Sequence, residues 1–221
     1  MSTTARWLAP CVALAVALLL ASPANAGPPL ICHPFTTDNA PSLPWADAHT
    51  WRATEAHYDV GRLAADTLAL LGSDTPVIAR METLRRATIY AATSPQVANE
   101  LLNAVLARAK TPADDPQASA LAEFDAGYLI ESYRQQSEID KMDMLAAFAR
   151  SSGVPLDALY GYARVENAIA MKPRDAAAME FAASLMTADK AAIKQHRVNA
   201  SAGAAPGSAL ARNIKEVWGI T

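Results

Sequence analysis

The chain has 221 residues, of which 52% are hydrophobic, 19% are charged and only 6% are aromatic. This length is typical of one domain, or of one domain with an appendage, that buries a core without disulfides or metals. The apolar fraction excludes a wholly disordered chain, and the net charge of −3 at pH 7 excludes a strongly basic nucleic-acid-binding protein.

The first 26 residues have the three-part pattern of a secretory signal peptide. Residues 1–6 carry one basic residue and no acid, residues 7–20 form an apolar run, and Ala24 and Ala26 are the small residues that a signal peptidase reads. A membrane anchor is the alternative, but a spanning helix needs about 20 apolar residues and this run is shorter. We therefore expect cleavage after Ala26, export to the bacterial periplasm or the medium, and no membrane span in the mature chain.

Residues 27–44 are predicted to form an extended, proline-rich arm. Five of the chain's 14 prolines lie in this segment, and each proline fixes its own φ and restrains the residue before it. A free linker rarely carries large apolar side chains such as Ile31, Phe35 and the adjoining Trp45. We expect these three side chains to be buried against the body of the protein.

Residues 45–198 are predicted to form an all-α domain of antiparallel helical hairpins. Thr75, Ser94 and Asp115 each precede a proline, which is the order of an N-cap residue and the first residue of a helix. Helical periodicity recurs along the body, and no stretch alternates with period two for long enough to predict a strand. About seven helices with short connections fit between Trp45 and Thr187, so neighbouring helices are expected to be antiparallel.

Two of these helices have features that the sequence predicts in more detail. In the helix after Pro76, the apolar spacing places Glu82 and Arg86 as an i, i+4 ion pair on the outer side. Ser151-Ser152-Gly153 is expected to be a turn, after which Pro155 begins the next helix.

Residues 161–173 resemble the second helix of a tetratricopeptide repeat. That pattern has a small residue followed at i+4, i+7 and i+10 by a bulky residue, an alanine and an aliphatic residue, and then by a proline. The residues at those positions are Gly161, Val165, Ala168, Met171 and Pro173. The resemblance covers about one repeat, although a stable array needs about three. It implies tetratricopeptide-like helical hairpins.

Residues 199–221 are predicted to be a flexible linker followed by a short helix. Residues 199–208 are rich in Ala, Ser and Gly, a composition typical of flexible linkers. The apolar side chains beyond them fall on one helical face: Leu210, Ile214, Val217 and Trp218. This face could dock back on the body or onto a partner, and we expect it to dock on the body.

The residues that could carry chemistry are few. Loss of the signal peptide leaves Cys32 as the one cysteine of the mature chain, which excludes an internal disulfide. Cys32, His33, His49 and His57 are candidate metal ligands, because a thiolate and imidazoles suit copper or zinc. If residues 47–57 are helical, His49 and His57 share a face. The alternative, that these side chains pack or face solvent, fits their spacing better.

The charges divide along the chain. Residues 114–143 hold eight acidic and two basic residues, whereas residues 189–216 hold five basic and two acidic residues. Each segment is either a solvated helix surface or part of an electrostatic gradient that orients a partner.

The sequence lacks the zinc-protease, nucleophile-elbow, phosphate-loop and dinucleotide motifs. It therefore predicts no cofactor, and it favours a binding or scaffolding module for a protein or peptide partner over an enzyme. The alternative is an exported metal-binding protein or enzyme that uses Cys32 and the nearby histidines.

Overall fold

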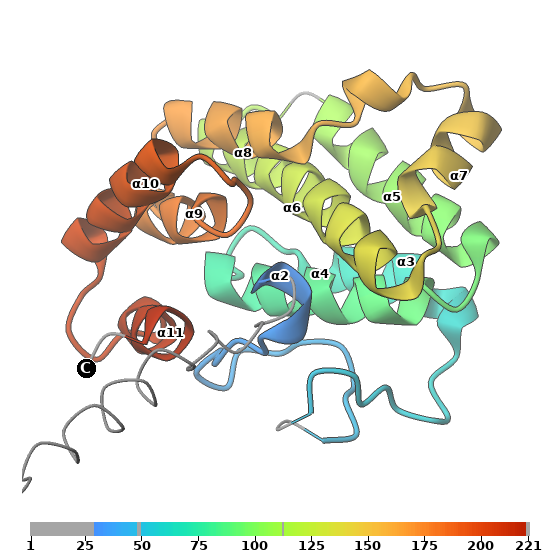
Figure 1. The fold of residues 1–221 in the computed structure, drawn as a ribbon, viewed down its shortest axis with the longest axis horizontal. Coiled ribbons are helices and arrows are strands. Elements are labelled where there is room, and N and C mark those ends of the chain that lie inside the picture. Colours follow the sequence, from blue (N-terminus) through green and yellow to red (C-terminus); the bar gives the residue numbers. More distant parts are fainter. Residues whose placement is uncertain (1–28, 48–49, 112, 220–221) are drawn as a thin grey trace, which may run out of the picture.

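The computed structural model describes residues 29–47, 50–111 and 113–219 (Figure 1). This part of the chain contains ten α-helices, two short 3-10 helices and no strand, which confirms the all-α prediction. Within it, no helix combines the length and apolar character that a membrane span requires. The predicted signal peptide, residues 1–26, lies outside the described residues.

The helices have the following bounds, in chain order: α2 (Pro29–Cys32), α3 (Leu63–Leu70), α4 (Val77–Ala91), α5 (Pro95–Lys110), α6 (Pro116–Asp140), α7 (Met144–Ser152), α8 (Gly161–Ala170), α9 (Ala176–Ala183), α10 (Lys190–Gly203) and α11 (Ala209–Trp218). The two 3-10 helices are Val60–Arg62 and Leu156–Ala158. The seven helices α3 to α9 match the number predicted between Trp45 and Thr187.

The proline-based helix starts are found at α5 and α6 but not at α4. Pro95 and Pro116 are the first residues of their helices, and the side chain of Asp115 accepts a hydrogen bond of 2.9 Å from the backbone N–H of Gln117. A proline costs nothing at this position because its missing N–H would have no partner in the helix. The start predicted at Pro76 was wrong by one residue, since Pro76 is the N-cap and α4 begins at Val77.

The turn predicted at Ser151-Ser152-Gly153 is the C-terminal end of α7. This helix continues through Ser152, and Gly153 adopts a φ of 73°, which is the left-handed C-cap that glycine favours.

Helix α6 runs through the middle of the molecule, between α4 and α8 (Figure 1). Its buried side chains face all round the helix and include several polar ones: Asp125, Glu131, Ser132, Gln135 and Gln136. Buried polar groups are generally paired within the protein, and Asp125, Glu131 and Gln135 each bond to another segment, whereas the Ser132 hydroxyl has no partner among the described residues. α6 therefore depends on ion pairs and hydrogen bonds with its neighbours.

Helices α6 and α8 touch backbone to backbone at Gly127 and Gly161. A Cβ added to Gly161 would lie 2.3 Å from the Gly127 carbonyl oxygen, and a Cβ added to Gly127 would lie 2.7 Å from the Gly161 carbonyl oxygen. Only a residue without a side chain fits where α8 meets α6.

The helix expected to begin at Pro155 starts only at Gly161, after the short 3-10 helix, so that prediction was wrong.

The predicted outward position of Glu82 on α4 was also wrong. Glu82 and Arg85 are fully buried, because the N-terminal arm covers this face of α4. Glu82 accepts hydrogen bonds from the Arg85 and Arg86 side chains at 2.8 and 2.7 Å, and from the backbone N–H of Phe35 in the arm at 3.0 Å. This carboxylate therefore joins the arm to the helical body.

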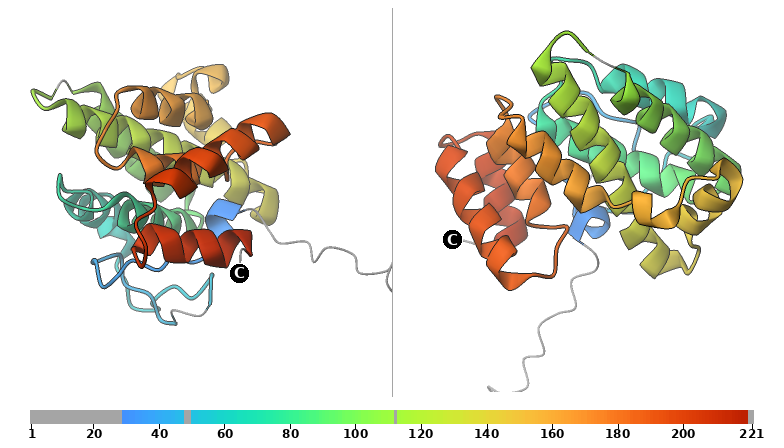
Figure 2. Two further views of the ribbon diagram at one scale, coloured as in Figure 1. Left: turned by 90° about the vertical axis from the view of Figure 1, so that its left-hand side faces the viewer. Right: turned by 90° about the horizontal axis from the view of Figure 1, so that it is seen from above.

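The arm itself is docked, as its apolar residues predicted. Ile31 and Phe35 are buried and Trp45 is half-buried, while Pro29–Cys32 forms a single helical turn, α2, in the otherwise irregular segment. In addition, Asn213 of α11 exchanges two hydrogen bonds with the backbone of Thr36, accepting at 3.0 Å and donating at 2.9 Å. The arm and the last helix thus hold each other on the body (Figures 1 and 2).

The predicted linker is shorter than expected. α10 continues through Gly203, so only residues 204–208 connect it to α11. Asp189 caps α10 by accepting from the N–H groups of Ala191 and Ala192, and this cap favours a helix despite the small residues at its far end. The predicted docking of α11 is confirmed, with Leu210 and Ile214 buried.

Candidate functional site

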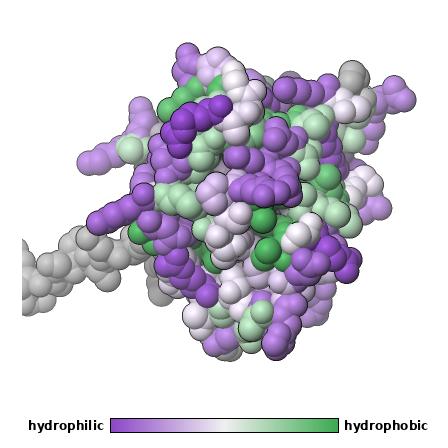
Figure 3. Space-filling model, turned by 90° about the vertical axis from the view of Figure 1, so that its right-hand side faces the viewer, coloured by the Kyte–Doolittle hydropathy of each residue, from purple (hydrophilic) through white to green (hydrophobic). Residues whose placement is uncertain are grey.

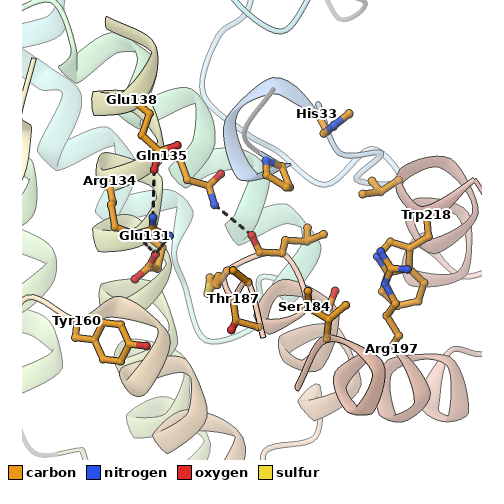
Figure 4. Close-up of a pocket in the computed structure, with 16 residues that line it drawn as sticks. His33, Glu131, Arg134, Gln135, Glu138, Tyr160, Ser184, Thr187, Arg197 and Trp218 are labelled. Carbon is orange, nitrogen blue, oxygen red and sulfur yellow. Dashed lines mark hydrogen bonds and ion pairs between the residues drawn. The ribbon is translucent and has the colours of Figure 1, made fainter. Parts of the chain in front are cut away.

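A cleft of about 680 Å³ lies between the C-terminal half of α6 and the α10–α11 side of the molecule. Figure 4 shows the α6 side chains on one side of it, Arg197 and Trp218 on the other, and Ser184 and Thr187 between them. The start of the arm and the loop before α8 complete the walls. We call this hollow the α6–α10 cleft.

The α6 wall is built from residues that repeat at helical spacing. Glu131, Arg134 and Glu138 line the cleft, and Arg134 bridges the two carboxylates, with its Nε 2.7 Å from Glu131 and its Nη1 3.3 Å from Glu138. The other oxygen of Glu131 accepts from the backbone N–H of Tyr162 at 3.2 Å. Because the first N–H groups of a helix lack partners inside it, this buried carboxylate also stabilises the start of α8.

The floor of the cleft is fixed by Gln135. Its amide oxygen accepts from the backbone N–H of Leu30 in α2 at 2.9 Å, and its amide nitrogen donates to the carbonyl of Leu185 at 3.2 Å. One side chain therefore ties the arm, α6 and the segment after α9 together. The shape of the cleft is set by these contacts before any ligand enters.

The opposite wall is aromatic and basic. The Arg197 guanidinium lies 5.0 Å from the centre of the Trp218 ring, which is within the range of a cation–π contact. Trp218 packs on Phe181 with ring centres 5.4 Å apart, and its indole Nε1 is buried without a hydrogen-bond partner among the described residues. Arg197 is exposed and forms no ion pair within the described part of the chain. This wall can offer a positive charge and an aromatic face.

A second polar cluster lies where α8, α9 and α10 meet. Nδ1 of His196 lies 2.5 Å from Glu180, Nε2 lies 2.8 Å from the Tyr162 hydroxyl, and Asn199 donates to the second Glu180 oxygen at 2.9 Å. Since a carboxylate only accepts hydrogen bonds, the N–H group of His196 is at Nδ1 and donates to Glu180. Burial, followed by the nearby Glu166 carboxylate, raises the pKa of Tyr162, so its hydroxyl stays protonated. The cluster joins three helices rather than activating a nucleophile.

The candidate metal ligands that the structure describes, Cys32, His33 and His57, are not brought together as a site. Cys32 ends α2 and is half-buried, and His33 follows it at the edge of the α6–α10 cleft. Residues 50–57 contain turns and no helix, so the condition under which His49 and His57 would share a helical face is not met in this segment. His57 is exposed there, and His49 lies outside the described residues. Across the described ranges, no three His, Cys, Asp or Glu side chains are grouped so that they could hold a metal.

Burial controls the protonation of the two arm residues. It raises the pKa of the Cys32 thiol, an effect that the Arg85 and Arg52 guanidiniums partly oppose. It also lowers the pKa of His33, which therefore favours its neutral form at the edge of the cleft. A thiol with a raised pKa reacts slowly, so Cys32 has the properties of a structural cysteine.

The sequence did not identify Glu131, Arg134, Gln135 or Arg197 as residues of one site. These residues are far apart in the chain, so their proximity in the cleft is not visible in the sequence, and the one local signal was the apolar face of α11 that ends at Trp218.

Comparisons of the chain with family models, with curated proteins and with solved structures gave no match.

Proposed function

We propose that the protein binds a protein or peptide partner in the α6–α10 cleft. The observation that carries this proposal is the convergence of six elements on one preformed hollow: the arm, α6, the loop before α8, the α9–α10 connection, α10 and α11. Ligand sites combine such concavity with a few placed polar groups. The acidic groups on the α6 wall are already paired with Arg134, which favours recognition over proton transfer.

The proposal extends to the place where the protein acts and to its architecture. The signal-peptide pattern of residues 1–26 supports export to the periplasm or the medium, and intact mass of the exported chain tests the cleavage after Ala26. The resemblance of residues 161–173 to a tetratricopeptide helix supports tetratricopeptide-like helical hairpins as the architecture around α8. Its main packing partners are α6 and α9, and not the preceding α7.

A peptide library displayed on phage tests the binding function directly. Peptides selected on the purified protein are measured by fluorescence anisotropy against two variants, Ala188→Trp and Ala113→Trp. Both alanines are exposed, but Ala188 lines the cleft and Ala113 precedes α6. We expect Ala188→Trp to abolish binding and Ala113→Trp to preserve it.

Equal binding to both variants would contradict the cleft as the binding site. A library that yields no peptide above background would contradict peptide recognition itself.

A further inference from the structure

A second hollow, of about 570 Å³, continues from the cleft along α10. It shares Ile193, Arg197 and Trp218 with the α6–α10 cleft, and it adds Lys190, Lys194, Val198 and Ser201 of α10. We call this second hollow the α10 groove. Because the two hollows lie on either side of the same Arg197–Trp218 contact, a chain-like ligand can occupy both.

The charges of the α10 groove are all positive. Lys190, Lys194 and Arg197 follow one another at i, i+4 and i+7, so they lie on one side of the helix. All three are exposed, and none forms an ion pair with a described residue. The adjacent Asp189 does not neutralise them directly, since its carboxylate accepts from the N–H groups at the start of α10.

Apolar surface lies between these charges. Ile193 is half-buried, and Val198 is 55% exposed, which is unusual for a β-branched side chain on a packed helix. The Trp218 ring closes the groove on the α11 side. The groove therefore combines a row of cations that form no ion pair with a described residue and exposed apolar surface.

We infer that the partner segment is an acidic peptide that carries an apolar side chain between its carboxylates. This inference rests on the proposed function and specifies the chemistry of its partner. Carboxylates along the segment pair with Lys190, Lys194 and Arg197, while the apolar side chain packs on Val198 and the Trp218 ring. Complementary charge of this kind speeds association and selects the partner.

The continuity of the groove with the α6–α10 cleft favours a peptide over an anionic membrane. A membrane surface is flat and contacts a protein from outside, whereas the groove shares Ile193, Arg197 and Trp218 with the cleft. A peptide can enter such a groove, and its backbone can continue into the adjoining cleft.

The probes are a fluorescein-labelled peptide of alternating Glu and Leu and a matched peptide of alternating Gln and Leu, measured by anisotropy. The test variants are Lys190→Glu with Lys194→Glu, and Val198→Ser. The control is Arg150→Glu on α7, an exposed cation that forms no ion pair with a described residue. α7 lies at the other end of the molecule from α10 (Figure 1), on a side where hydrophilic residues surround small apolar groups (Figure 3).

We expect saturable binding of the Glu peptide that weakens by roughly tenfold in the double charge reversal and with the Gln peptide. Val198→Ser should also weaken binding, and Arg150→Glu should bind like the wild type. Equal affinity of the wild type and the double variant for the Glu peptide would overturn the inference.

Two further outcomes separate this inference from the proposed function. If library peptides lose binding in Ala188→Trp but are neutral or basic, the binding function stands and the acidic partner is wrong. If vesicles of phosphatidylglycerol bind the protein through Lys190 and Lys194 while the Glu peptide does not bind, the groove is a membrane contact and the inference is overturned.

Discussion

Replacing Gly161 by alanine tests the contact that positions α8 against α6. The added Cβ would lie 2.3 Å from the Gly127 carbonyl oxygen and 2.7 Å from Cγ of Glu131. The first of these atoms is backbone, so relief requires α8 to move by about 1 Å, and overpacking of this kind costs about 1–3 kcal/mol. Alanine recovers less than about 1 kcal/mol of helix propensity in return. The expected loss of unfolding free energy is about 2 kcal/mol.

Urea denaturation followed by circular dichroism measures this loss, and Gly72→Ala is the matched control. The nearest atom to a Cβ at Gly72 is the Thr75 hydroxyl oxygen at 3.8 Å, an ordinary contact, so the control should stay within about 0.5 kcal/mol of the wild type. The double variant with Gly127→Ala should cost less than the sum of the single variants, because one displacement of α8 relieves both clashes. A Gly161→Ala variant as stable as Gly72→Ala would refute the backbone contact.

Two pairs of buried side chains give further expectations. Tyr133→Phe should cost about 1 kcal/mol, because the Tyr133 hydroxyl donates to the Ala98 carbonyl at 2.9 Å, whereas Tyr128→Phe should be neutral or stabilising, because the buried Tyr128 hydroxyl has no partner within the described residues. Thermal unfolding of both variants compares them, and an equal loss would contradict the assignment. Burial raises the pKa of Asp125 to about 6 despite Arg80, 2.6 Å away. The folded state therefore binds a proton here more tightly than the unfolded state, and the contribution of Asp125 to stability should fall as the pH rises from about 4 to 6. Arg80→Met should accordingly cost about 3 kcal/mol at pH 7 and less at pH 4.5, where the carboxyl is neutral; denaturant titrations at the two pH values measure the difference, and a cost independent of pH would contradict it.

The sequence predicts the parts of this fold that local chemistry determines. The starts of α5 and α6 follow from proline at the first helical position, and the end of α7 follows from a glycine in the left-handed region. The docking of the arm follows from apolar residues in a segment whose prolines reduce the entropy lost on ordering. Each of these signals lies within a few residues of the structure that it specifies.

The same reasoning fails where a distant segment changes the surroundings of a residue. Glu82 lies on the charged side of the α4 pattern, and a pattern alone assigns that side to solvent. Its burial depends on Phe35, 47 positions earlier in the chain, whose backbone N–H donates to it. The contact of Gly161 shows the same limit. The sequence predicts a small residue at this position, but it does not predict that Gly161 packs against Gly127 of α6.

Charge shows this limit most clearly, and it decides where a partner is expected to bind. By composition, the acidic segment 114–143 and the basic segment 189–216 are equivalent candidates for a charged surface. In the structure, Asp125, Glu123 and Asp140 each pair with an arginine 45, 41 and 88 positions away, respectively, so three of the eight acidic residues are neutralised from outside the segment. No acidic side chain of the described residues comes to Lys190, Lys194 or Arg197 in the same way. The sum of charges along the chain therefore does not reveal which charges stay without an ion pair in the folded protein, and among the described residues three such cations lie together on α10, where the groove lies.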